Sequence, residues 1–191
     1  MLVEETVAEE LQTGGAEAIR LYVAACAERM APLFIGLQAG EAGREADLDF
    51  YVASVGDLWG TDRPLSDAAG RARLLERFPE LQSTEDGITD IAGTYAFFAC
   101  LVLRYALLAN GSGNADHAVS CGHAALTAMG MLDQNIQRAV FSADEHQLQA
   151  LSVSGNAVGL WEASVAAGRE RLRAVLSRNG GPAGAPAQLA N

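Results

Sequence analysis

Histidine and cysteine side chains could bind a metal ion in this chain, but their spacing favours no metal site. The three histidines are His117, His123 and His146. On a helix His117 and His123 lie about 120° apart and do not share a face, whereas His117 and Cys121 do. Two ligands are too few for zinc, which takes four, or three and a water. We therefore expect no metal ion and no cofactor, and local hydrogen bonds for His117 in the first turn of a helix.

Nucleophilic and phosphate-binding chemistry also lacks its usual residues. Cys121 and His117 are four residues apart, but no acid is placed to orient the histidine. All thirteen basic residues are arginine, which excludes a Schiff-base lysine, a lysine general base and a phosphate-loop lysine. No Gly-x-Ser-x-Gly or Gly-x-Gly-x-x-Gly motif occurs. We predict no catalytic residue; an enzyme would need carboxylates and His117 or His123 to converge in a cleft.

The charge of the chain points to a protein partner. The net charge is −11, which is a poor match for nucleic acid because nucleic-acid binding depends on neutralising phosphates. Residues 162–191 contain four arginines and two glutamates, so the acidity is concentrated in residues 1–161. A basic protein would suit such a surface, although negative charge also keeps soluble proteins dispersed.

The N-terminus and the most apolar segment predict a cytoplasmic, soluble protein. Glu4, Glu5, Glu9 and Glu10 make the first residues acidic, the opposite of a signal peptide. Three cysteines without paired spacing argue against a disulfide framework. The apolar run at 95–108 is shorter than the roughly 20 residues of a membrane span, and Arg104 interrupts it. We expect no membrane contact.

The same apolar run organises the predicted fold. Of residues 95–108, only Arg104 is not apolar, and a helix that is apolar all round must be surrounded. Alanine and leucine are abundant and strand patterns are almost absent. We predict an all-α single domain over 1–178, with about six helices around a buried central helix at 86–110. The Gly/Pro/Ala-rich tail at 179–191 should be disordered.

The other helices are delimited by glycine, proline and capping residues. The first should break near Gly14-Gly15 and end at Pro32. Ser142 and Glu145 have the spacing of a capping box at the start of the last helix. The predicted ranges are 4–30, 47–59, 66–78, 86–110, 116–138 and 142–176, the last with a kink at 154–156.

Several polar and aromatic residues are candidates for binding. Glu85, Asp86 and Asp90 could form a negative contact surface, or could only cap the central helix. Arg104 must pair with an acid or reach solvent, and we expect it in a buried polar network with Glu28-Arg29. Trp59 and Trp161 could anchor an interface or cover the core. The candidate binding residues are thus Glu28, Arg29, Trp59, Glu85, Asp86, Asp90, Arg104 and His117.

Four local patterns occur in one order over residues 20–133. They are Cys26-Ala27-Glu28-Arg29-Met30 with Pro32 and Phe34; Asp57-Leu58-Trp59; Leu75-Glu76 and Pro79 before Glu85-Asp86; and His117-Ala118-Val119 before Met131-Leu132. In this order the chain resembles the YjaG-like proteins, a family of uncharacterised bacterial helical proteins. The resemblance implies an all-helical fold of similar size and no established activity. The Arg-rich C-terminal third departs from that family.

Two functions remain open. The first is a non-enzymatic helical interaction module that binds a basic protein through its acidic surface, with an immunity or antitoxin-like role as one concrete form. The alternative is a helical protein that binds or senses a small molecule, with Tyr95, Phe97, Phe98 and Tyr105 lining a pocket between helices. Self-association is open under both.

Overall fold

The computed structural model describes residues 2–82, 90–136, 140–154 and 157–179. These residues are all-helical, as predicted, and contain no strand. The elements in chain order are α1 (Glu5–Thr13), α2 (Gly15–Gln38), α3 (Glu45–Leu58), α4 (Ala68–Leu75), the 3-10 helix η1 (Pro79–Leu81), α5 (Ile91–Ser112), α6 (Ala115–Asn135), α7 (Phe141–Ser154) and α8 (Ala157–Asn179). The predicted tail lies almost wholly outside the described residues.

The described residues form eight α-helices, where the sequence predicted about six. Gly15, with a φ of +79°, separates α1 from α2, because a left-handed residue ends a helix and glycine adopts it without strain. The predicted last helix is present as α7 and α8, and most of its predicted kink lies outside the described residues.

Pro32 does not end a helix, contrary to the prediction. It lies inside α2, which continues to Gln38. Proline cannot donate to the carbonyl of residue i−4, which here is Glu28. Burial of the next turn offsets this loss, since Leu33 and Phe34 are fully buried and Phe34 stacks on Tyr51 with ring centroids 4.4 Å apart. Tertiary packing therefore overrides the local signal.

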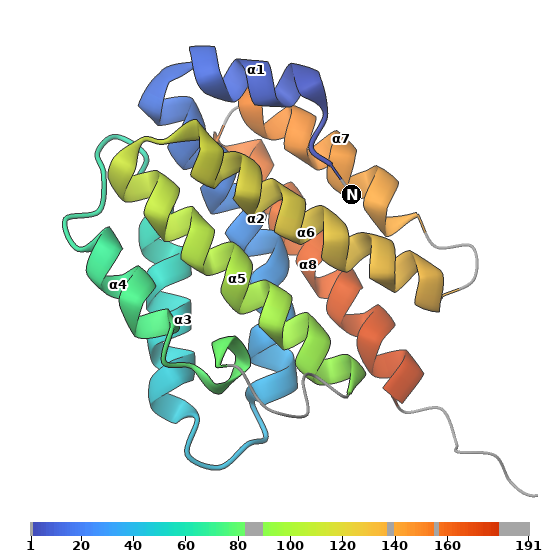
Figure 1. The fold of residues 1–191 in the computed structure, drawn as a ribbon. Helices are drawn as coiled ribbons and strands as arrows, with labels where there is room; N and C mark the ends of the chain where they lie inside the picture. The colour runs from blue at the N-terminus through green and yellow to red at the C-terminus, as the bar shows by residue number, and fades with distance from the viewer. Residues whose placement is uncertain (1, 83–89, 137–139, 155–156, 180–191) are drawn as a thin grey trace, which may run out of the picture.

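The long helix α2 is the packing centre of the bundle (Figure 1). It packs against α1, α3, α5, α6, α7 and α8. Its buried residues include Tyr22, Cys26 and Arg29, so this helix carries a charged side chain into the interior.

The apolar helix α5 runs from Ile91 to Ser112 and ends later than predicted. Asp90 caps it, accepting a hydrogen bond from the Gly93 amide at 2.6 Å, and Gly113 ends it with a φ of +65°. Its predicted start at 86–89 lies outside the described residues. Tyr95, Cys100 and Leu103 are buried, whereas the opposite side of the helix is half-buried.

Among the described helices, α5 alone is long and apolar enough to cross a membrane by length and composition. At 22 residues it is longer than the apolar run read from the sequence. Core helices of soluble proteins meet the same criteria, and somewhat under half of its most apolar stretch is buried in the fold.

Candidate functional site

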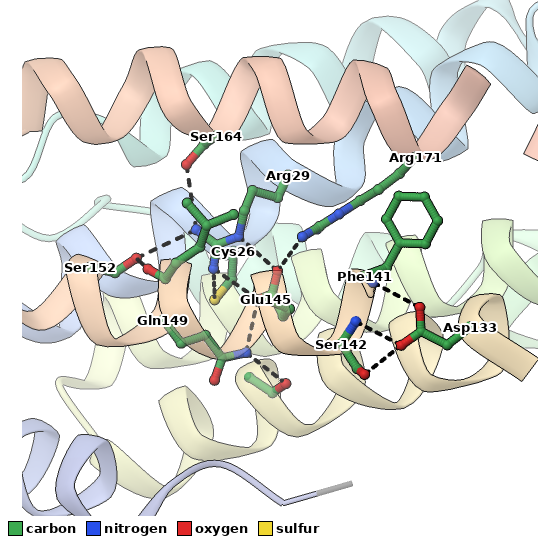
Figure 2. A network of polar contacts seen from close by, with 12 residues as sticks. Cys26, Arg29, Asp133, Phe141, Ser142, Glu145, Gln149, Ser152, Ser164 and Arg171 are labelled. Carbon is green, nitrogen blue, oxygen red and sulfur yellow. Dashed lines mark hydrogen bonds and ion pairs between the residues drawn. The ribbon is translucent and has the colours of Figure 1, made fainter. Parts of the chain in front are cut away.

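The interior contains a cluster of charged residues from three helices. The Glu145 carboxylate on α7 accepts hydrogen bonds from Arg29 Nε and Nη2 on α2, both at 2.9 Å. Arg171 Nη2 on α8 donates to the same carboxylate at 2.6 Å. All three side chains are at most 2% exposed. Figure 2 shows how they point toward one another between the helices.

Further polar side chains surround this cluster. Arg29 Nη1 donates to Ser152 and Ser164 at 3.4 Å each, and its Nη2 also donates to Cys26 Sγ at 3.2 Å (Figure 2). Gln149 Nε2 donates to Glu145 Oε1 at 2.8 Å, the same oxygen that accepts from Arg29 Nη2. The Tyr22 hydroxyl on α2 donates to Gln149 Oε1 at 2.8 Å, and Gln149 Nε2 also donates to the Gly122 carbonyl on α6 at 3.1 Å.

The charges of the cluster fix its protonation states. Burial raises the pKa of Glu145, but the charges of Arg29 and Arg171 outweigh it and lower the pKa to about 2. Burial lowers the pKa of Arg29, and the Glu145 charge reverses this and raises it. Burial lowers the pKa of Arg171, and this effect is larger than the opposing effect of the Glu145 charge. With two arginines and one glutamate, the cluster has one excess positive charge.

The cluster joins helices and does not adjoin the surface hollows described below, which other residues line. A buried ion pair contributes little net stability compared with apolar residues, but loss of one partner is costly. The cluster links α7 and α8 to α2.

A different feature, at the surface, has the character of a binding site. A hollow of about 380 Å³ lies where the end of α3 and the start of α8 both meet α2. We call it the tryptophan groove; it is lined by Glu28, Gly56, Trp59, Ala157, Val158 and Trp161. Trp161 is 47% and Val158 73% exposed. Large apolar side chains of this exposure at a hollow mark an interaction surface more often than a core.

One charged side chain lies in this apolar groove. Glu28 is half-buried, and its Oε2 accepts a hydrogen bond from Trp59 Nε1 at 3.0 Å. Its neighbour Arg29 points into the interior and is paired with Glu145. Among the described residues, no arginine or histidine forms an ion pair with Glu28. A positively charged group of a ligand could therefore pair with the Glu28 carboxylate in the hollow that both tryptophans line.

Two other hollows are more polar than the tryptophan groove, and Leu65 and Ser66 contribute to both. The first, about 420 Å³, is lined by Asp57, Gly60, Asp62, Arg63, Pro64, Leu65 and Ser66. The second, about 260 Å³, is partly lined by His117, which is half-buried. Asp57 is already paired with Arg71 at 2.7 Å. Neither hollow brings His117 together with His123 or a group of acids.

Arg104 does not belong to the buried network, which corrects the prediction. Its Nη2 lies 2.6 Å from Glu76 Oε1, and both side chains are partly exposed. Glu28 and Arg29 are also separated, because neighbours on a helix face different directions: Glu28 faces the groove and Arg29 faces the core. The three residues thus have three different environments.

The remaining candidates do not form one site. Asp90 caps α5, and Glu85 and Asp86 lie outside the described residues. Cys121 is buried, and no group of three or more metal-binding side chains occurs in the described ranges. Tyr95, Phe97, Phe98 and Tyr105 line none of the hollows described above; the rings of Phe97 and Phe98 pack edge to face at 5.2 Å.

Sequence reasoning missed Glu145, Arg171 and Val158. Glu145 was read as a capping-box residue, but Asp133 at the end of α6 accepts hydrogen bonds from the Phe141 and Ser142 amides at 2.7 and 3.0 Å. Capping by Asp133 leaves Glu145 free to point inward. Arg29, whose helical neighbours Ala25, Cys26 and Leu33 are apolar, is the signal that could have indicated a buried acid as its partner.

The chain was compared with protein families, curated proteins and solved structures, and no match was found in any of the three.

Proposed function

We propose that this chain is a non-enzymatic helical module that binds a basic segment of another protein in the tryptophan groove. One observation carries the proposal: two tryptophans and an uncompensated, half-buried carboxylate line the same surface hollow. Tryptophan is among the residues that contribute most to binding energy at interfaces. The partner should bring apolar groups for the indoles and a positive charge for Glu28.

The net charge of −11 supports the same class of partner. A strongly acidic protein attracts basic proteins over distances comparable to the Debye length and accelerates their association. An immunity or antitoxin-like role against a basic toxin is one concrete form of this function. Cytoplasmic location and kinship with the YjaG-like proteins belong to the same proposal and rest on the sequence patterns.

Selection from a random peptide library tests the proposal without knowledge of the partner. The immobilised chain should enrich peptides that combine basic with aromatic or aliphatic residues, with affinities that fall as salt rises. Trp161→Ala should abolish this enrichment. Leu176→Ala is the matched control, because Leu176 lies on the same helix and is equally exposed, at 46%, but does not line the groove.

Two outcomes would overturn the proposal. One is enrichment of peptides without basic residues, which would remove Glu28 from recognition. The other is equal binding of the selected peptides to the wild type and to Trp161→Ala, which would place the interface elsewhere.

A further inference from the structure

Resting on the proposed function, we infer that the group held in the tryptophan groove is the guanidinium of a partner arginine, in preference to a lysine ammonium. Three properties of the groove carry the inference: the chemistry of Glu28, the two indoles and the apolar wall beside them. Each is matched by a different part of the arginine side chain.

The Glu28 carboxylate has room for more hydrogen bonds. A carboxylate has about four lone-pair positions. Among the described residues, Trp59 Nε1 donates a hydrogen bond to this side chain, at Oε2. A guanidinium presents several N–H groups in a planar fork and can donate to both oxygens at once. An ammonium is a point charge and cannot reproduce that geometry.

The indole rings favour the same group. Guanidinium ions stack on aromatic faces and are attracted to the electron-rich ring, most strongly to tryptophan. Guanidinium is also less strongly hydrated than ammonium, so its transfer from water into a half-open groove costs less. Both tryptophans of the chain line this groove, so a cation beside Glu28 lies within reach of indole.

The remaining wall suits the methylene part of the arginine. Val158 and Ala157, at the start of α8, provide apolar surface at the mouth of the groove. Arginine side chains bury their methylene groups along such surface while the charged end reaches its partner. The groove volume of about 380 Å³ leaves space for a complete side chain.

The test uses small arginine analogues and the two indole signals of the ¹⁵N-labelled protein. Nα-acetyl-arginine methylamide should shift both Nε1–H signals, because both tryptophans line the groove. The citrulline analogue has nearly the same shape without charge, and its affinity should be at least about tenfold lower. The affinity of the lysine analogue should also be lower than that of the arginine analogue. Tetramethylammonium provides a cation without N–H donors.

Two variants locate the binding. Glu28→Gln keeps an oxygen for the Trp59 hydrogen bond but removes the charge, so arginine affinity should fall about tenfold. Glu162→Gln removes the same charge from an exposed residue beside Trp161 that does not line the groove, and affinity should be nearly unchanged. Trp161→Ala changes an exposed position and leaves Glu28 in place, and it should also lower the affinity for the arginine analogue.

The outcomes separate the inference from the proposed function. If selected peptides bind through Trp161 but the lysine analogue or tetramethylammonium binds as well as arginine, the arginine inference is wrong and the proposed function stands. If neither peptides nor the arginine analogue shift the indole signals, both are wrong. Equal effects of Glu28→Gln and Glu162→Gln would show general charge attraction and would also refute the inference.

Discussion

Arg29 and Glu145 form a two-pronged ion pair in the protein interior, with Nε–Oε2 and Nη2–Oε1 distances of 2.9 Å each. The residues are separated by 116 positions in the sequence, and neither is exposed. The pair connects the long helix α2 to α7, and Arg171 on α8 completes it at 2.6 Å. Association of these helices therefore depends on charges that have no access to water.

Glu145→Gln should strongly destabilise the protein. It removes the only negative charge of the cluster and leaves Arg29 and Arg171 buried without compensation. Breaking a buried pair in this way typically costs roughly 3–5 kcal/mol. Urea unfolding measured by circular dichroism gives the free energy of unfolding. A loss below about 1 kcal/mol would show that water reaches the cluster.

Arg104→Ala should have a much smaller effect on stability. Its pair with Glu76 is partly exposed, with the Arg104 side chain 28% and the Glu76 side chain 48% accessible. Exposed pairs contribute about 0–1 kcal/mol because solvent screens them. The melting temperature of this variant should change by only a few degrees. A shift as large as that of Glu145→Gln would contradict the assignment of Arg104 to the surface.

Acid should weaken the fold through Glu145. Its pKa is lowered to about 2 from the ordinary value of 4.5, so between these values the unfolded chain binds a proton that the folded chain does not. The contribution of this residue is complete above about pH 4.5 and is lost as the pH falls toward 2. An NMR titration of the Glu145 carboxyl carbon measures the shift. A midpoint at or above 4.5 would refute it.

Gly122→Ala should destabilise the contact between α6 and α2. A methyl group at Gly122 would collide with the Tyr22 hydroxyl and would lie 2.9 Å from Val3 Cγ2. Overpacking of a well-packed interior costs roughly 1–3 kcal/mol. Gly56→Ala is the control for thermal unfolding, since a methyl group there meets no atom within 4 Å and alanine favours a helix. Equal melting temperatures for the two variants would contradict the packing.

Local sequence signals predicted the helices well where the determinants are local. The Gly14-Gly15 break and the all-α class follow from glycine positions and apolar spacing. Pro32 was misread because burial of Leu33 and Phe34, a tertiary effect, keeps α2 continuous. Some helix ends differ from the prediction by a few residues. The end of α5 was predicted at residue 110, before Gly111, but the helix continues to Ser112 because Gly113 is the glycine with the left-handed conformation.

The candidate site was harder to predict because its residues are distant in sequence. Trp59 and Trp161 were recognised as interface candidates, but their common groove depends on how α3 and α8 meet α2. Glu145 satisfied a local capping pattern, and only the approach of Arg29 and Arg171 shows its actual role. Arg104 was expected inside because its neighbours are apolar, yet it lies on the half-buried side of α5.

The three buried cysteines can serve as reporters of local opening of the fold. Cys26, Cys100 and Cys121 are free thiols within the core, and burial raises the pKa of Cys100 and of Cys121, which keeps them in the unreactive protonated form. Alkylating reagents should therefore modify the folded chain only when helices separate. The labelling rate of each thiol, resolved by peptide mass spectrometry, would report how often α2, α5 and α6 part from one another under native conditions.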